Sequence, residues 1–297
     1  MVKKRTLAER FFDIIIYFIM GLLSITCILP LIHIFAISLS DKSAAMAGWV
    51  GLWPVNFTTV AYEYIVRKPE FIIAFFTSLK RLAFGIPMNM VMVLITAYPL
   101  SKQPREFKGR SIYMWYFVFT MLFGGGLIPV YLTISRLKML DTIWALVLPG
   151  LLPVWNMILM VNFFRGLPKA LEESAFIDGA GHILVLLNIY IPLSLPALAT
   201  IGLFTAVGHW NAWFDGMIYM NSPSNYPLQT YIRTVVAAAT QDITRILEGE
   251  NWRIMSKLSD KAVKSSQIFL GALPILMIYP FLQRYFMTGI VLGSVKE

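Results

Sequence analysis

Five aromatic and polar side chains gather near the end of a long apolar stretch: His209, Trp210, Asn211, Trp213 and Asp215. Aromatic faces combined with hydrogen-bonding side chains suit the binding of a polar solute such as a sugar. An ionisable residue inside an apolar span is by default a functional candidate. The alternative is a belt of interfacial aromatic residues at a membrane boundary, and the sequence leaves both interpretations open. A second set of the same chemistry lies in the stretch 142–164: Trp155, Asn156 and Asn162.

The chain carries none of the motifs that bind nucleotide phosphates or catalyse hydrolysis. It lacks G-x-x-x-x-G-K-[ST], so any ATP must be bound by another chain. G-x-S-x-G and H-E-x-x-H are also absent. The three histidines, His33, His182 and His209, are too scattered along the chain to form a metal-binding set. We therefore expect a non-catalytic protein with no metal or cofactor of its own.

The composition places these residues in a membrane. Of 297 residues, 58% are hydrophobic and only 14% are charged, and the mean hydropathy is +0.68. A soluble domain is nearer half apolar and a quarter charged. The net charge of +9 does not indicate nucleic-acid binding, because the basic residues punctuate apolar spans and form no patch with aromatic residues.

Several stretches are long and apolar enough to cross a bilayer as helices, for which about 20 residues suffice. They lack the alternation of a barrel, the other structure that satisfies backbone groups in lipid. Lys80 and Arg81 interrupt the second stretch, which we expect to enter the bilayer near residue 82. The sequence predicts an all-α polytopic protein with six spans, at about 14–37, 72–100, 111–134, 142–164, 193–220 and 266–288.

Basic residues near the span ends set the expected orientation. Lys3, Lys4, Arg5 and Arg10 precede the first span, which favours a cytoplasmic N-terminus. Six spans then return the C-terminus to the cytoplasm. The expected organisation is a cytoplasmic N-terminus (1–13), one transmembrane domain (14–290) with external loops 38–70 and 222–266, and a cytoplasmic tail (291–297). The segment 166–191 then falls on the cytoplasmic side.

This cytoplasmic segment contains helix punctuation. Pro168 suits a first helical position, where no backbone N–H is needed, and residues 169–177 are long enough for two to three turns. Gly179 suits a left-handed stop after the helix. A second helix is expected over 182–190, and the prolines that follow restrict how it continues into the fifth span. The positions of proline and glycine alone predict only an ordinary helix that connects two spans.

Three glycines interrupt the third span shortly before a proline. Gly124, Gly125, Gly126 and Pro129 would weaken or kink a helix there and allow close packing or movement. Simple helix packing is the alternative interpretation.

The cytoplasmic segment resembles the EAA loop of ABC importer permeases, E-A-A-x-x-D-G-A followed by I-x-x-P-x-x-x-P. Ser174 departs from the usual alanine, and Leu186 stands where the family often has phenylalanine. The resemblance implies the transmembrane fold of a type I ABC importer, in which this short helix docks on the ATPase and Glu173 meets a basic group there. The matching positions are Glu173, Ser174, Ala175, Asp178, Gly179, Ala180, Ile189, Pro192 and Pro196.

The resemblance extends over nearly the whole chain to the maltose-type carbohydrate permeases, within which it is nearest the complex-oligosaccharide group. Four strings carry it: AYPLS at 97–101, MLFGGGLIPVY at 121–131, VGHWN at 207–211 and YPLQ at 226–229. The loop 222–266 resembles one that reaches into the cleft of a binding protein, with a solvated cap as the alternative. Its contact candidates are Tyr226, Gln229, Arg233 and Arg245.

The resemblance implies a bacterial cytoplasmic-membrane complex. Its partners would be a second related permease, two ABC ATPase subunits that bind ATP and Mg²⁺, an extracytoplasmic solute-binding protein and an oligosaccharide, with no nucleic acid. The loop 222–266 holds six basic and four acidic residues, which permits an acidic, uronate-type sugar. A non-sugar solute is the first alternative. A secondary transporter is the second, although we find no internal repeat and Asp215 is the only acid within an expected span.

Overall fold

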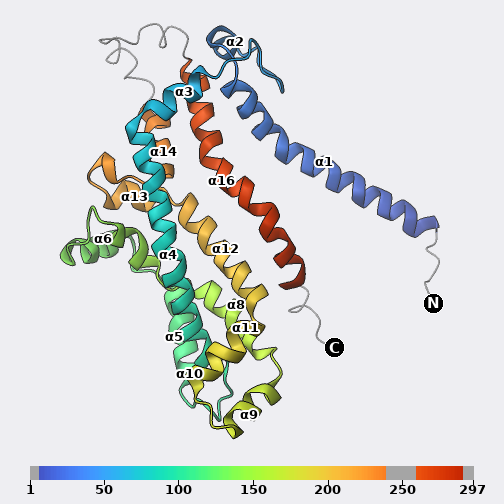
Figure 1. The fold of residues 1–297 in the computed structure, drawn as a ribbon, viewed down its shortest axis with the longest axis vertical. Helices are drawn as coiled ribbons and strands as arrows, with labels where there is room; N and C mark the ends of the chain where they lie inside the picture. Colours follow the sequence, from blue (N-terminus) through green and yellow to red (C-terminus); the bar gives the residue numbers. More distant parts are fainter. Residues whose placement is uncertain (1–6, 239–258, 290–297) are drawn as a thin grey trace. The chain divides into compact units, whose positions relative to one another are not determined.

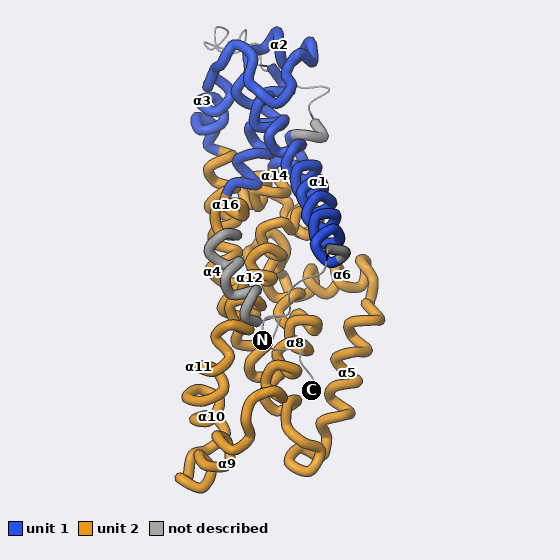
Figure 2. The backbone as a smooth tube through the Cα atoms, turned by 90° about the vertical axis from the view of Figure 1, so that its right-hand side faces the viewer, with its two compact units in different colours: residues 1–69, 232–273 blue, residues 70–231, 274–297 orange. Residues whose placement is uncertain are grey.

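The computed structural model describes residues 7–238 and 259–289, and every regular element in this part of the chain is helical, as predicted (Figure 1). Contacts divide the chain into two compact units, residues 1–69 with 232–273 and residues 70–231 with 274–297 (Figure 2). The helices are α1 (Leu7–Ser38), α2 (Lys42–Ala47), α3 (Val60–Arg67), α4 (Pro69–Ser101), α5 (Arg110–Leu122), α6 (Leu127–Arg136), α7 (Ile143–Val147), η1 (Leu148–Gly150), α8 (Val154–Arg165), α9 (Lys169–Ile177), α10 (His182–Val185), η2 (Leu186–Tyr190), α11 (Ile191–Leu193), α12 (Leu195–Asn211), α13 (Phe214–Tyr219), η3 (Pro223–Asn225), α14 (Leu228–Ala238) and α16 (Asp260–Gly289).

The first unit is built from small side chains near the end of α1 and from α2 and α3. Ala36, Ala44 and Ala61 are buried there together with Ala262 of α16. Asp41 caps α2 by accepting hydrogen bonds from the backbone N–H groups of the next turn. The large apolar side chains of α1 are exposed, and the segment Glu9–Ser38 has a hydropathy of 2.5. That surface is suited to lipid.

The second unit packs α4, α8 and α12 around one apolar core. Val93 and Ala97 of α4 meet Met157, Met160 and other residues of α8, and Ile201 of α12 closes the cluster. Full burial of such side chains stabilises the fold by roughly 1.5–3 kcal/mol each in water. In a bilayer the gain comes mainly from close packing.

The described helices include three that are long and apolar enough to cross a membrane, or up to six if each bent pair forms one span. The third expected span is α5 and α6, bent by 107°, and the fourth is α7–η1 and α8, bent by 47°. The second is one continuous helix of 33 residues, and its entry into the bilayer near residue 82 stays a prediction.

The glycines of the third span mark its break. Phe123 is extended, and Gly126 has φ +83°, a left-handed value that glycine adopts without strain. Pro129 falls in the first turn of α6, where a missing N–H removes no helical hydrogen bond. The chain therefore changes direction at 123–126.

Asp141 fastens the connection between α6 and α7 to the turn after α13. Its backbone N–H donates to the Tyr219 carbonyl at 2.9 Å. Its carboxylate accepts from the backbone N–H groups of Asn221 and Ser222, each at 3.1 Å, and from the Ser222 hydroxyl at 2.7 Å. These bonds, led by that from the Ser222 hydroxyl, hold the pKa of Asp141 below its ordinary value of 3.8. The residue itself is left-handed, with φ +60°.

We predict that Asp141→Ala destabilises the protein by about 2 kcal/mol, since it loses the carboxylate bonds and places alanine in a left-handed conformation. Thermal unfolding in detergent should show a decrease in Tm of roughly 4–8 °C. Asp141→Asn should lose less, because asparagine tolerates this backbone and keeps one acceptor. The carboxylate's contribution is present above the unfolded pKa and disappears as the pH falls through the lower folded pKa. Equal stability of all three proteins would contradict this account.

Candidate functional site

Helix α9 forms over the residues that the punctuation predicted, Lys169–Ile177. Pro168 takes the N-cap position, one residue before the position expected for it. At the other end, Gly179 has φ +84°, and its N–H donates to the Phe176 carbonyl at 3.1 Å. The N–H of Ala180 reaches back to the Ala175 carbonyl at 2.9 Å. This pair of bonds is the Schellman motif, which explains why glycine stands at 179.

The two faces of α9 differ in chemistry. Ala175 and Ala180 pack against the core of the second unit, and their small side chains allow that close approach. Ile177 lies on the side of the helix away from Ala175 and is 85% exposed, whereas Leu171 and Phe176, which flank the packed side, are 44% and 38% exposed. Glu173, Ser174 and Asp178 are also exposed. Exposed apolar and acidic side chains on this short helix are thus available for contact with another protein.

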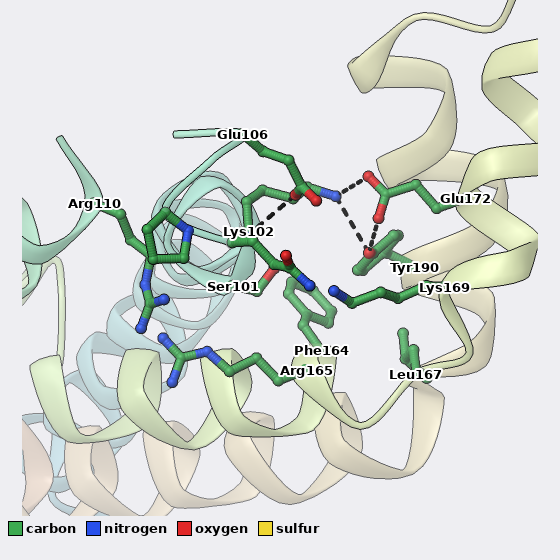
Figure 3. Close-up of a pocket in the computed structure, with 12 residues that line it drawn as sticks. Ser101, Lys102, Glu106, Arg110, Phe164, Arg165, Leu167, Lys169, Glu172 and Tyr190 are labelled. Carbon is green, nitrogen blue, oxygen red and sulfur yellow. Dashed lines mark hydrogen bonds and ion pairs between the residues drawn. The ribbon is translucent and has the colours of Figure 1, made fainter. Parts of the chain in front are cut away.

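A buried ion pair fixes the first turns of α9 to the end of α4 (Figure 3). The Lys102 ammonium pairs with Glu172 and donates to the Tyr190 hydroxyl at 3.2 Å. The Tyr190 hydroxyl donates in turn to the second Glu172 oxygen at 2.6 Å. Three side chains from three separate segments thus form a closed triangle. Since a buried charge without its partner is costly, the triangle holds these segments together.

Aromatic rings enclose the ammonium of this triangle. It lies 3.9 Å from the centre of the Tyr98 ring and 4.5 Å from that of Tyr190. Tyr98 also hydrogen-bonds Nδ1 of His182, the first residue of α10, at 3.1 Å. Burial lowers the pKa of Lys102, and the bond to Glu172 partly offsets that effect. The cluster therefore connects α4, α9, α10 and the π-helical segment η2.

The segment after α9 is broken repeatedly. It runs as α10, the π-helical η2 and α11 before α12 begins, and the whole bends by 83°. Pro192 lies in the first turn of α11 and Pro196 in that of α12, positions that tolerate the missing N–H. Ile189 packs on the core. The second helix expected over 182–190 is thus present only in part as regular α-helix.

A second polar network lies inside the bundle around Arg81 of α4. The guanidinium forms a bidentate ion pair with Asp215 of α13. It also donates from Nη2 to the Leu146 carbonyl at 3.2 Å and from Nε to Nδ1 of His209 at 3.2 Å. Arg81 is 3% exposed. The network therefore ties α4 to α7, α12 and α13.

The hydrogen bonds of His209 determine its tautomer. Nδ1 accepts from Arg81, so the ring proton resides on Nε2 and is donated to Asn89 Oδ1 at 2.8 Å. Asn89 then donates to the carbonyls of Gly150 and Leu151 at 2.8 and 2.9 Å. Both ring nitrogens of His209 are used within the chain. Gly85 leaves room for that ring, since a Cβ there would lie 2.6 Å from Nε2.

Sequence reasoning missed Arg81 and Asn89 as members of this network. The sequence marks Arg81 only as an interruption of the second span, next to Lys80. Ionisable residues within spans usually pair with one another, but this tendency does not identify which base pairs with Asp215. Asn89 gave no comparable signal, because one amide in a helix has many ordinary roles.

The other pathway candidates are dispersed. Trp210 is buried, with its ring 6.0 Å from that of Phe75, and Trp213 packs on Phe214. Asn156 is buried and donates to the Thr205 hydroxyl at 3.3 Å. Trp155, Asn162 and Asn211 are exposed.

The residues expected to touch a binding protein are only partly described. Tyr226 packs against the cluster formed by α6, α7 and α13. Gln229 is half-buried on α14 and Arg233 is exposed. Arg245 lies outside the described residues.

We predict that Asp215→Leu destabilises the protein by about 3–5 kcal/mol, because it leaves the Arg81 charge buried without a counter-charge. The double variant Arg81→Met/Asp215→Leu removes both charges and should recover most of that loss, apart from the bonds to Leu146 and His209. Thermal unfolding of the purified proteins measures the difference. A single variant as stable as the wild type would contradict the pairing.

Known proteins were compared with the chain. No protein-family model matches it. It is 35% identical over 291 residues to the polygalacturonan/rhamnogalacturonan transport system permease protein YtcP of Bacillus subtilis (strain 168), covering 97% of this chain and 99% of the relative. It is 38% identical over 293 residues to protein LplC of the same organism, covering 98% and 97%.

A solved structure is similar over almost its full length. This is the crystal structure of a bacterial ABC transporter involved in the import of the acidic polysaccharide alginate, with a TM-score of 0.86 and 28% identity over 96% of this chain and 100% of that one. The apolar helices and these relatives together indicate a multi-pass membrane protein. The chain therefore belongs to the family of ABC transporter permeases for carbohydrate uptake.

Proposed function

We propose that this chain forms half of the translocation pathway of an ATP-driven importer and receives mechanical work through α9. The observation that carries the proposal is the construction of α9. It is a short helix with an exposed apolar and acidic face, and it is fixed on its other side to α4 by the triangle of Lys102, Glu172 and Tyr190. A force that the ATPase applies to α9 would be transmitted through this triangle to α4 and so to the membrane-spanning helices.

Six spans are consistent with this role if each bent helix pair counts as one crossing. The basic N-terminal residues favour a cytoplasmic N-terminus, which also places α9 on the cytoplasmic side with the ATPase. In this arrangement Glu173 offers a carboxylate to a basic group of the ATPase, a charge-assisted contact. ATP and Mg²⁺ are bound by that partner.

The pathway candidates divide into two groups. His209 is hydrogen-bonded to Arg81 and Asn89, and Asp215 is paired with Arg81. We therefore assign both residues to the framework of the pathway. Trp155, Asn162 and Asn211 are exposed and are better placed to meet a sugar, Trp155 through its ring face and the two asparagines through their amide groups.

The proposed solute is an oligosaccharide, of an acidic type. Support comes from the similar permease named for polygalacturonan and rhamnogalacturonan, which contain galacturonate, and from the similar importer of the acidic polysaccharide alginate. A second related permease, two ATPase subunits and a solute-binding protein would complete the complex. The binding protein would meet the loop 222–266, with Tyr226, Gln229, Arg233 and Arg245 as the contact candidates.

We predict that Glu173→Lys and Gly179→Pro each leave membrane insertion intact but reduce solute-stimulated ATP hydrolysis at least about tenfold, the loss expected for one charge-assisted contact. The lysine opposes a basic group on the ATPase. Proline cannot adopt the φ of +84° at residue 179. The measurement uses the chain purified with its co-expressed partner subunits.

Two variants serve as controls. Glu70→Lys makes the same charge reversal on an exposed residue in the first turn of α4, and Gly179→Asn keeps a residue that tolerates a left-handed backbone. Both should retain coupling. Normal hydrolysis and uptake by Glu173→Lys and Gly179→Pro would show that α9 is only a connector.

The solute assignment predicts that cells lacking this chain lose uptake of labelled oligogalacturonides but keep uptake of neutral malto-oligosaccharides. Restoring the chain should restore uptake. If deletion spares every oligosaccharide tested and abolishes uptake of a non-sugar solute, the carbohydrate assignment fails while the permease assignment stands.

A further inference from the structure

A cavity of about 270 Å³ opens beside the Lys102 triangle, between the end of α4, the start of α5, the end of α8 and the first turn of α9 (Figure 3). Its volume is several times the roughly 30 Å³ share of one water molecule, so it admits a tetrahedral anion with solvent. Six charged residues line it: Lys102, Arg110, Arg165 and Lys169 with Glu106 and Glu172.

The charges of this cavity do not balance. Lys102 and Glu172 neutralise each other. Of the remaining lining residues, three are cations (Arg110, Arg165, Lys169) and one is an acid (Glu106), which leaves an excess of two positive charges. Within the described residues, none of these three cations forms an ion pair.

The two arginines are positioned for a shared ligand. Figure 3 shows the guanidinium groups of Arg110 and Arg165 near each other at the cavity, and the two are close enough for the charge of Arg110 to act on Arg165. Arg165 is held there by a hydrogen bond from Nη2 to the Leu100 carbonyl at 3.1 Å. The Nε of Arg110 is buried and has no hydrogen-bond partner among the residues that the structure describes. A buried donor without an acceptor carries a desolvation cost that an anion in the cavity would remove.

Like charges at this separation repel, and an anion between them reverses the sign of the interaction. The planar guanidinium fork matches the geometry of phosphate oxygens, and a pair of forks selects phosphate over a monovalent halide. Lys169 supplies a third cation from the first turn of α9.

We propose that this cavity binds a phosphate group between Arg110 and Arg165, with Lys169 as the third contact. The cavity lies where two membrane-crossing segments end, at Ser101 and Arg110, which is the level of lipid headgroups. The phosphate is carried either by an anionic phospholipid or by a small soluble compound. The proposal is independent of the transported solute and of the role assigned to α9.

The test compares the full chain, purified with its partner subunits, as the wild type and as Arg110→Gln/Arg165→Gln. The control is Arg105→Gln/Lys108→Gln, which also removes two positive charges, at exposed residues of the connection between α4 and α5 that do not line the cavity. Native mass spectrometry after exchange into nanodiscs of phosphatidylglycerol or phosphatidylcholine measures lipid retention. Titration with inorganic phosphate in a neutral detergent measures binding of the soluble ligand.

The cavity variant should lose phosphate-dependent binding about tenfold or more, while the control retains it. Retention of phosphatidylglycerol lost only in the cavity variant supports the lipid as the source. Phosphate binding lost only in that variant, with no lipid preference, supports a soluble compound. If the double variant does not fold, Lys169→Gln at the exposed start of α9 replaces it, with the same expected direction.

Three results would overturn the proposal. Equal losses in the cavity variant and the control would show general surface electrostatics. Unchanged lipid retention together with absent phosphate binding in the wild type would show that no phosphate site exists. Loss of a partner subunit from the cavity variant, with lipid retention unchanged, would assign the arginines to a carboxylate of that partner.

Discussion

A charge removed from water must find its counter-charge within the protein, and this requirement organises the second unit. Arg81 is held by Asp215, and Lys102 is held by Glu172. Each pair joins segments that are distant in sequence, and each base donates further hydrogen bonds, from Arg81 to His209 and Leu146 and from Lys102 to Tyr190. Close-packed alanines and valines would let neighbouring helices slide, whereas a bidentate ion pair fixes their register.

Besides these two ion pairs, the unit contains places where its helices break. Gly126 lets the chain turn between α5 and α6, and Pro192 and Pro196 separate the short helices before α12. Buried backbone groups need partners at each break, and the Asn89 amide supplies them for the carbonyls of Gly150 and Leu151. A bundle built in this way combines rigid junctions with places where the chain changes direction.

Structural features determined by neighbouring residues could be predicted from the sequence, whereas contacts between distant residues could not. Helix α9 and its glycine stop follow from proline and glycine chemistry within a few residues, so the bounds at 169 and 177 were predictable. The partner of Asp215 lies 134 residues away, and nothing in periodicity pairs a base in one apolar stretch with an acid in another. The glycines of the third span indicated a kink near residues 124–126, with simple packing as the alternative, but the size of the bend, 107°, depends on backbone angles that composition does not give. The sequence presents His209 as a candidate for contact with the solute, whereas in the structure both of its ring nitrogens are hydrogen-bonded within the chain.

Helix α4 connects the two polar junctions, the ion pairs of Arg81 and Lys102, without a break in the helix. Arg81 lies within it and Lys102 immediately follows its last residue, so 21 positions (102 minus 81) separate them. At 1.5 Å per residue, that separation is about 30 Å, close to the thickness of the hydrocarbon core. Pro87 lies in the stretch between the two junctions and Pro99 near the end of the helix, and neither can donate the backbone hydrogen bond of a regular helix. Helix α4 therefore joins the two polar junctions over a distance close to the thickness of the hydrocarbon core, with a proline in the middle of that distance.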